Sequence, residues 1–107
     1  MLLSIITPTY KRVKYLKKNL IEMNLLNSTF KSFEWIIIVE KKDKTTIEFL
    51  RRNKKKFIKL IIGKQKSVEQ AFEKGVKKSK GKYINFHGDD DFFELKNFRL
   101  INKKLFL

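Results

Sequence analysis

KYINFHGDDDFF, residues 82–93, is a short apolar strand pattern that runs directly into three consecutive aspartates. The chain otherwise carries 26 Lys and Arg residues against 11 Asp and Glu residues, so this cluster is unusual in a basic sequence. Neighbouring carboxylates repel one another unless a cation lies between them. A divalent metal with a diphosphate behind it would supply that cation. A solvated acidic turn whose last Asp caps the next helix is the simpler alternative.

Three further strand patterns precede this one in the chain. Residues 2–7 form a continuous β-branched and apolar run, and residues 33–39 and 57–62 are two further, mainly apolar runs, the last of which is closed by Gly63. Runs of this kind are typical of buried parallel strands. We expect Pro8 to end the first strand, because proline cannot donate to a ladder.

Helical patterns separate these strands. Residues 11–27 have apolar side chains at three- and four-residue steps, which predict a helix with one face toward a core: Val13, Leu16, Leu20, Met23 and Leu26. Residues 43–54 predict a second helix, which either Asp43 or Thr45 would cap.

The last two helical patterns flank the acidic strand. Residues 67–79 predict a helix that opens with Ser67 and Gln70 as a capping box. The residues after the aspartates, 93–106, are also predicted to be helical. Alternating strands and helices indicate an α/β domain with a mostly parallel sheet and right-handed crossovers.

Three loop segments fall at the carboxyl ends of the predicted strands: residues 7–10, 40–43 and 88–91. In open parallel sheets, ligands bind beyond these ends. Two of the segments carry acidic side chains, and oxygen ligands favour a hard cation such as Mg²⁺ or Mn²⁺. Tyr10 could lie against a base with Thr9 hydrogen-bonding it, although Thr9 as an ordinary helix cap is the simpler interpretation.

Composition limits the other possibilities. A chain of 107 residues supports one domain with a modest core, and the absence of Cys excludes a disulfide framework or a thiolate metal site. The net charge of +15 could attract nucleic acid, anionic lipid or phosphorylated substrates. Lysines are, however, scattered along the whole chain, with residues 51–56 as the only dense block. No signal peptide or membrane-spanning run is visible, and a cytoplasmic setting is expected.

Four segments, taken in order, resemble the family 2 glycosyltransferases, which have the GT-A nucleotide-sugar-binding fold. SIITPTYKR (residues 4–12) is similar to the opening strand and turn of that family, and FEWIIIVE (residues 33–40) to its second strand. The stretch from residue 67 to residue 84 is similar to its third helix and the strand that follows. NFHGDDD (residues 85–91) is similar to the strand that ends in the DxD motif.

The resemblance implies a role for each matching residue. The nucleotide-diphospho-sugar donor, of UDP type, would be held by Pro8, Thr9, Tyr10, Glu40 and Asp89. A Mg²⁺ or Mn²⁺ ion would be bound by Asp90 and Asp91. The sugar would pass to an unknown hydroxyl acceptor, as in a transferase of hexosyl type that serves cell-surface polysaccharide biosynthesis.

Several residues depart from the family pattern. Lys41 replaces an acid that commonly contacts the base. Alignment on the preceding strand makes Gly88 and Asp90 the ends of the DxD motif, whereas a literal match selects Asp89 and Asp91. The family domain is roughly twice as long as this chain, like a typical α/β domain. We therefore expect residues 1–107 to form a single partial domain, the donor-nucleotide half, and assign no catalytic base.

Three hypotheses remain open at this point. The first is the donor half of a glycosyltransferase, which would be inactive alone. The second is a catalytically inactive, truncated nucleotide-binding remnant. The third is a basic module that binds nucleic acid or an anionic membrane, led by Lys54, Lys55 and Lys56. Nucleic acid is the least expected partner, because no aromatic-basic stacking pattern is present. Peripheral contact with an anionic membrane, at its inner face, fits the net charge.

Overall fold

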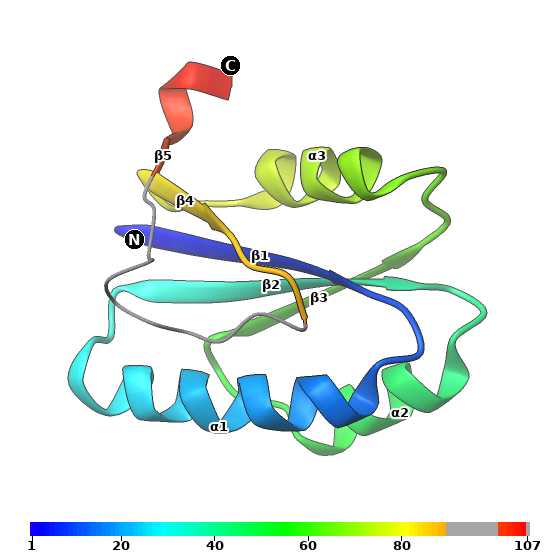
Figure 1. The fold of residues 1–107 in the computed structure, drawn as a ribbon. Helices are drawn as coiled ribbons and strands as arrows, with labels where there is room; N and C mark the ends of the chain where they lie inside the picture. The colour runs from blue at the N-terminus through cyan, green and yellow to red at the C-terminus, as the bar shows by residue number, and fades with distance from the viewer. Residues whose placement is uncertain (90–100, 107) are drawn as a thin grey trace.

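Figure 1 shows the fold of the chain in a computed structural model, which describes residues 1–89 and 101–106. These residues contain strands β1 (Leu3–Thr9), β2 (Phe33–Glu40), β3 (Ile58–Gly63), β4 (Tyr83–Phe86) and β5 (Ile101–Asn102). They also contain helices α1 (Val13–Thr29), α2 (Lys44–Arg52) and α3 (Val68–Lys78), and a final 3-10 helix, η2 (Lys103–Phe106). The alternation of strands and helices predicted from the sequence is confirmed through β4.

The strands form one sheet in the order β3-β2-β1-β4-β5. β1 pairs in parallel with β2 and β4, β2 pairs in parallel with β3, and β5 runs antiparallel to β4. Helices α1 and α2 cover one face of the sheet, and α3 covers the other (Figure 1). The strand order therefore reverses between β1 and β4, as in Rossmann-like sheets. The predicted mostly parallel α/β fold is confirmed.

Both faces of the sheet are buried, because successive side chains of a strand point to opposite sides. The face under α1 and α2 is packed by one cluster, which includes Ile5, Leu16, Met23, Trp35, Ile37 and Val39. The face under α3 is packed by the other, which consists of Ile6, Ile36, Ile38, Ala71, Val76 and Ile84. Gly75 lets α3 approach β1 closely, since a Cβ there would lie 2.5 Å from Cγ2 of Ile6.

The prediction that Pro8 ends the first strand is wrong, because β1 continues to Thr9. Pro8 is paired with Ile38 of β2 in the ladder. The carbonyl of Ile6 accepts from the backbone N–H of His87 on the β4 side, and Pro8, two residues on, has its missing donor on that same side. The ladder between β1 and β4 has already ended at Ile6, so no bond is lost.

The helix starts follow the sequence signals in part. Asp43, one of the two predicted caps, accepts from the backbone N–H of Thr46 at the start of α2. Ser67 Oγ accepts from the N–H of Gln70 at 3.1 Å. The reciprocal bond of the capping box goes elsewhere, because Oε1 of Gln70 accepts from the N–H of Lys66 at 2.6 Å. The side chain of Gln70 therefore secures the loop before α3.

The prediction of a helix over residues 93–106 is wrong at residues 101 and 102, while residues 103–106 are helical. Ile101 and Asn102 form β5, with Ile101 opposite Ile84 and Asn102 opposite Tyr83 of β4. The outer edge of β4 offers unpaired backbone groups, and pairing with them overrides local helix propensity. η2 follows as a 3-10 helix. Residues 93–100 lie outside the described part of the chain.

A buried carboxylate closes the amino-terminal end of the sheet. Glu34, at the start of β2, is 2% exposed, and its Oε2 accepts from Ser4 Oγ and from the N–H of Lys80, each at 2.6 Å. Nζ of Lys59 lies 2.8 Å from its Oε1. Burial raises the pKa of Glu34, but the contacts with Lys59, Ser4 and Lys80 outweigh burial, so this pKa is lowered.

Candidate functional site

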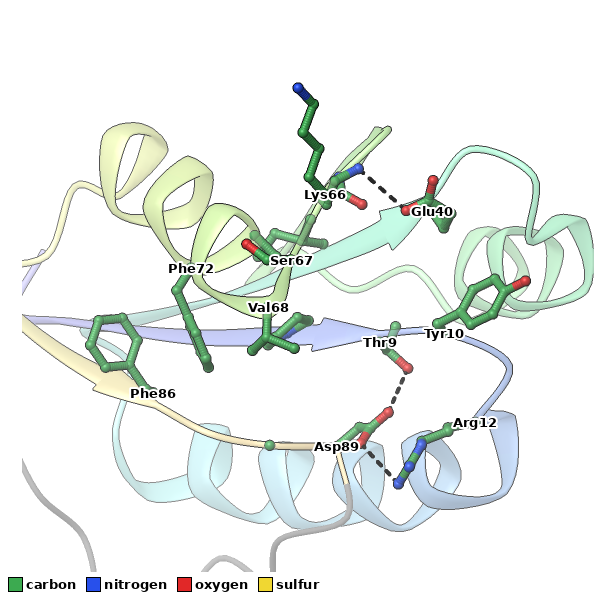
Figure 2. Close-up of a pocket in the computed structure, with 15 residues that line it drawn as sticks. Thr9, Tyr10, Arg12, Glu40, Lys66, Ser67, Val68, Phe72, Phe86 and Asp89 are labelled. Carbon is green, nitrogen blue, oxygen red and sulfur yellow. Dashed lines mark hydrogen bonds and ion pairs between the residues drawn. The ribbon is translucent and has the colours of Figure 1, made fainter.

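A pocket of about 710 Å³ opens at the carboxyl ends of the central strands, where the strand order reverses. It lies between the end of β1, the end of β4 and the start of α3 (Figure 2). Ligands bind at this position in open α/β sheets. All five residues predicted to hold the donor lie in its wall: Pro8, Thr9, Tyr10, Glu40 and Asp89. The structure thus brings together side chains from three separate strand ends.

Asp89 is the centre of the contacts on one side of the pocket. Its Oδ2 accepts from Thr9 Oγ1 at 2.9 Å, and its Oδ1 lies 3.8 Å from Nη1 of Arg12. Figure 2 shows both partners converging on the carboxylate. Asp89 is only 8% exposed, so its charge is held by these contacts more than by water. Thr9 is therefore a partner of Asp89 and belongs to β1, which rules out its alternative role as the cap of α1.

The turn between β1 and α1 is held by a second carboxylate. Lys11 has a backbone φ of 54°, in the left-handed region, and its N–H donates to Oδ2 of Asp43 at 2.6 Å. Asp43 also caps α2 through Thr46. Burial raises the pKa of Asp43, but Thr46 and the Lys11 N–H lower it by more, so the net shift is downward. Asp43 thus fixes the backbone that presents Tyr10.

Tyr10 stands at the mouth of the pocket and is 42% exposed. Nζ of Lys11 lies 5.2 Å from the centroid of its ring and Nζ of Lys42 lies 5.5 Å from it. A cation within about 6 Å of an aromatic face is attracted by the ring quadrupole. The rim of the pocket is therefore both aromatic and positively charged, which suits a ligand with a flat ring and a phosphate.

Glu40 and Gln65 form the opposite wall. Oε2 of Glu40 accepts from the backbone N–H of Gln65, at 3.4 Å. The side-chain Nε2 of Gln65 is buried and has no hydrogen-bond partner among the residues that the structure describes. The pocket wall therefore offers the acceptor-only carboxylate of Glu40, whereas Nε2 of Gln65 is buried behind it.

Comparison with known proteins identifies the family of this chain. Residues 4–103 match the family described as Glycosyl transferase family 2. The chain belongs to that family. A glycosyltransferase of Rickettsia bellii (strain RML369-C), described as uncharacterized, is 34% identical over 91 residues, which are 84% of this chain and 13% of that protein. This family 2 chain thus spans a small part of its relative.

Solved structures of glycosyltransferases share the fold of this family 2 chain. The mannosyltransferase PcManGT from Pyrobaculum calidifontis, in complex with GDP-Man and Mn²⁺, has a TM-score of 0.76 and 13% sequence identity, and the match covers 89% of this chain and 29% of the PcManGT chain. TarS residues 1–349 from S. aureus, in complex with UDP-GlcNAc, have a TM-score of 0.64 and 20% identity, and the match covers 99% of this chain and 29% of the TarS chain. The predicted GT-A fold is confirmed.

The metal prediction for this family 2 domain rests on residues that the structure does not describe, because Asp90 and Asp91 fall within residues 90–100. Among residues 1–89 and 101–106, no group of three His, Cys, Asp or Glu side chains could hold a metal ion. Asp89 lies at the pocket, so the triplet begins there. Its donors are all carboxylate oxygens, which fit Mg²⁺ or Mn²⁺ in kind.

Sequence reasoning missed several residues of the pocket. Those with chemistry to offer are Arg12, Gln65, Lys66 and Ser67, and an apolar floor is added by Phe72 and Phe86. The rings of Phe72 and Phe86 meet edge to face, with centroids 4.6 Å apart. Arg12 carried a signal, since a basic residue follows the first strand end. Gln65 could have been found as a polar residue between β3 and α3.

Proposed function

We propose that this domain binds the nucleotide of a nucleotide-diphospho-sugar, together with Mg²⁺ or Mn²⁺, in the pocket at the carboxyl end of the sheet. In the complete enzyme, the sugar would pass to a hydroxyl acceptor as the nucleoside diphosphate leaves. One observation carries the proposal: strand ends far apart in sequence place Thr9, Tyr10, Glu40 and Asp89 around one pocket. Residues 1–107 would form the donor half of that enzyme.

The nucleoside would lie between Tyr10 and the wall formed by Glu40 and Gln65. A carboxylate can only accept hydrogen bonds, so Glu40 would accept from an N–H of the base, such as N3–H of uracil or N1–H of guanine. We propose a donor of UDP type, because TarS, which shares the fold, is solved in complex with UDP-GlcNAc. A GDP donor is the nearest alternative, because PcManGT is solved in complex with GDP-Man.

The diphosphate and the metal would lie toward the acidic triplet. We propose that Asp90 and Asp91 bind the cation, while Asp89 keeps the end of β4 beside Thr9 and Arg12. When bound, the metal would offset the charge that develops on the departing diphosphate. Arg12, whose side chain is 48% exposed, would add a second positive charge near the phosphates.

Calorimetry of the 107-residue chain with UDP tests this proposal. We expect binding that requires Mn²⁺ or Mg²⁺ and is abolished in Asp90→Ala and in Asp91→Ala, because a carboxylate ligand to the cation is removed. Glu73→Ala is the matched control, since it removes an exposed carboxylate on α3 that only pairs with Lys77. Equal UDP affinity with EDTA present would refute the role of the metal.

A second proposal concerns the opposite end of the domain. An open hollow of about 530 Å³ is lined there by Met1, Asn24, Asn27, Lys31, Phe33, Lys55, Lys56 and Phe57. Met1, which lines this hollow with the lysines, is an exposed apolar residue, and Leu2 beside it in the sequence is exposed too. Lysines around exposed apolar side chains suit the surface of an anionic bilayer. We propose peripheral contact of this surface with an anionic membrane at its cytoplasmic face.

Co-sedimentation with vesicles tests the membrane contact. Binding to vesicles that contain phosphatidylserine, but not to pure phosphatidylcholine, is expected, and it should weaken in Lys55→Glu/Lys56→Glu and at high salt. Preferential binding to RNA or DNA under the same salt would instead favour a nucleic-acid surface. The described helices include none that is long and apolar enough to cross a bilayer.

A further inference from the structure

Asn19 is a polar residue on the buried face of α1. It lies on the same inward stripe as Leu16 and Met23 and is 1% exposed. A buried amide is destabilising unless its polar atoms are hydrogen-bonded. Nδ2 of Asn19 donates to the backbone carbonyl of Asp89 at 2.6 Å, and its Oδ1 lies 3.1 Å from Nε2 of His87. One side chain of α1 thus holds both residues that flank Gly88.

The direction of these hydrogen bonds defines which ring nitrogen of His87 carries a proton. The carbonyl of Asp89 can only accept, so it must face the NH₂ group of Asn19, and Oδ1 must then face His87. Since Oδ1 is an acceptor, Nε2 of His87 carries a proton. His87 is itself buried, and its backbone N–H donates to the carbonyl of Ile6 at 2.9 Å. His87 therefore connects α1 to the central strand β1.

Gly88 explains why two bonds are needed. A glycine has no Cβ and its torsions are weakly restricted, so the chain that leaves β4 could follow many paths. Asn19 contacts the ring of His87 before Gly88 and the backbone carbonyl of Asp89 after it, and the backbone of His87 is held by its own bond to Ile6. With its backbone held, the carboxylate of Asp89 reaches Thr9 Oγ1 and approaches Arg12.

We infer that Asn19 and His87 are positioning residues, which set the position of Asp89, the first residue of the acidic triplet, and thereby tune binding of the donor diphosphate. Neither side chain lines the pocket, so they act through Asp89. The inference rests on the proposed function for the ligand that is affected. The nucleoside wall, formed by Tyr10, Glu40 and Gln65, does not depend on this network.

Calorimetry with two ligands tests the inference. In Asn19→Asp, the amide donor becomes a carboxylate oxygen that repels the carbonyl of Asp89. We expect Mn²⁺-dependent UDP affinity to fall about tenfold or more, as for loss of a buried hydrogen bond, whereas uridine affinity stays the same. A merely structural role would lower both affinities together. Lys17→Gln, which makes the same change of one charge unit at an exposed position on the same helix, is the matched control and should change neither.

Further measurements cover the other outcomes. Asn19→Leu should fold and lose UDP affinity as Asn19→Asp does, while His87→Gln, which retains a donor, should recover part of it. Nitrogen-15 NMR of the His87 ring in the unmodified chain should show a protonated Nε2. An unprotonated Nε2, or variants that bind UDP like the unmodified chain, would overturn the inference. Failure of the unmodified chain to bind UDP would refute the proposed function instead, and the ring measurement would still decide this inference.

Discussion

Strand β2 carries a glutamate at each end, on the same face of the sheet, and the two carboxylates have opposite surroundings. Glu34 at the amino end is enclosed by Ser4, Lys59 and the N–H of Lys80. Glu40 at the carboxyl end faces the pocket and has a longer contact of 3.4 Å with the Gln65 N–H. A glutamate therefore stabilises the fold at the amino end of β2, whereas the glutamate at the carboxyl end lines the pocket.

The difference follows from the chain path at each end. At the amino end, the segment that enters β4 crosses closely over β1, and the N–H of Gly81 donates to Ser4 Oγ at 2.8 Å. At the carboxyl end, the connections to α1 and α3 leave toward opposite faces of the sheet and open the pocket (Figure 1). Stability and binding should thus respond to separate substitutions.

Gly81→Ala should have the largest effect on stability, because it disrupts the closed end, the tightly packed amino end of the sheet around Ser4 and Glu34. A Cβ there would lie 2.5 Å from the backbone nitrogen of Ser4 and 2.7 Å from the carbonyl carbon of Leu3, and backbone cannot move aside cheaply. We expect a loss of about 3 kcal/mol in the free energy of unfolding, measured by urea denaturation. At Gly63 the nearest atoms are side-chain ends at 3.6 and 3.7 Å, so Gly63→Ala is the control and should be far milder.

Glu34→Gln should be the next largest change at the closed end. The substitution keeps the shape but removes the charge that Ser4, Lys59 and the Lys80 N–H contact, and we expect a loss of about 2 kcal/mol near pH 7. Because the pKa of Glu34 is lowered in the fold, its contribution is present above the unfolded pKa and is lost as the pH falls through the folded one.

The stability difference between the original chain and Glu34→Gln should therefore shrink as the pH is lowered from 7 toward 3. Denaturation curves at several pH values measure this difference. Glu48→Gln removes an exposed carboxylate that pairs with Arg52 and should change the unfolding free energy little at any pH. A difference for Glu34→Gln that stays constant with pH would contradict the assigned role of its charge.

Glu40→Gln is the same substitution at the open end, and its effect should be on binding. Replacing an acceptor-only group with an amide removes one charge-assisted hydrogen bond to the base, so we expect UDP affinity to fall about tenfold. The free energy of unfolding should change little. Loss of stability without loss of UDP affinity would show that Glu40, like Glu34, stabilises the fold and does not contact the ligand.

The sequence predicted features that repeat within one element and missed those that join distant elements. Continuous apolar runs located β1 to β4, and the aspartates marked the pocket, because both signals are local. The buried role of Glu34 depends on Lys59, and that of Asn19 on His87 and Asp89, which periodicity cannot pair. An Asn within the inward stripe of α1 was nevertheless a visible signal.

The two wrong structural predictions have the same origin. Pro8 is tolerated inside β1 because the neighbouring ladder stops before it, and residues 101–102 form a strand because the edge of β4 is available. Both depend on which strands lie side by side, and local propensity does not determine that. The predicted metal ligands Asp90 and Asp91 fall outside the described residues and remain predictions.

Lys11→Asn should have the smallest effect and should be stabilising. Lys11 has a φ of 54°, and asparagine adopts the left-handed region more readily than lysine. The N–H that donates to Asp43 is kept. We expect a gain of a few tenths of a kcal/mol, up to about 1, in thermal or urea denaturation. Lys14→Asn, within the first turn of α1, should instead be neutral or slightly destabilising.

Paramagnetic NMR with Mn²⁺ and UDP locates the donor site on the domain, because Mn²⁺ broadens signals only near where it binds. We predict that UDP with Mn²⁺ broadens the backbone amide signals of Thr9, Gly88 and Asp89 at the open end. The amide signals of Ser4, Glu34 and Gly81 at the closed end should stay sharp in the same sample. Broadening centred on the closed end, or broadening that does not depend on UDP, would contradict the account.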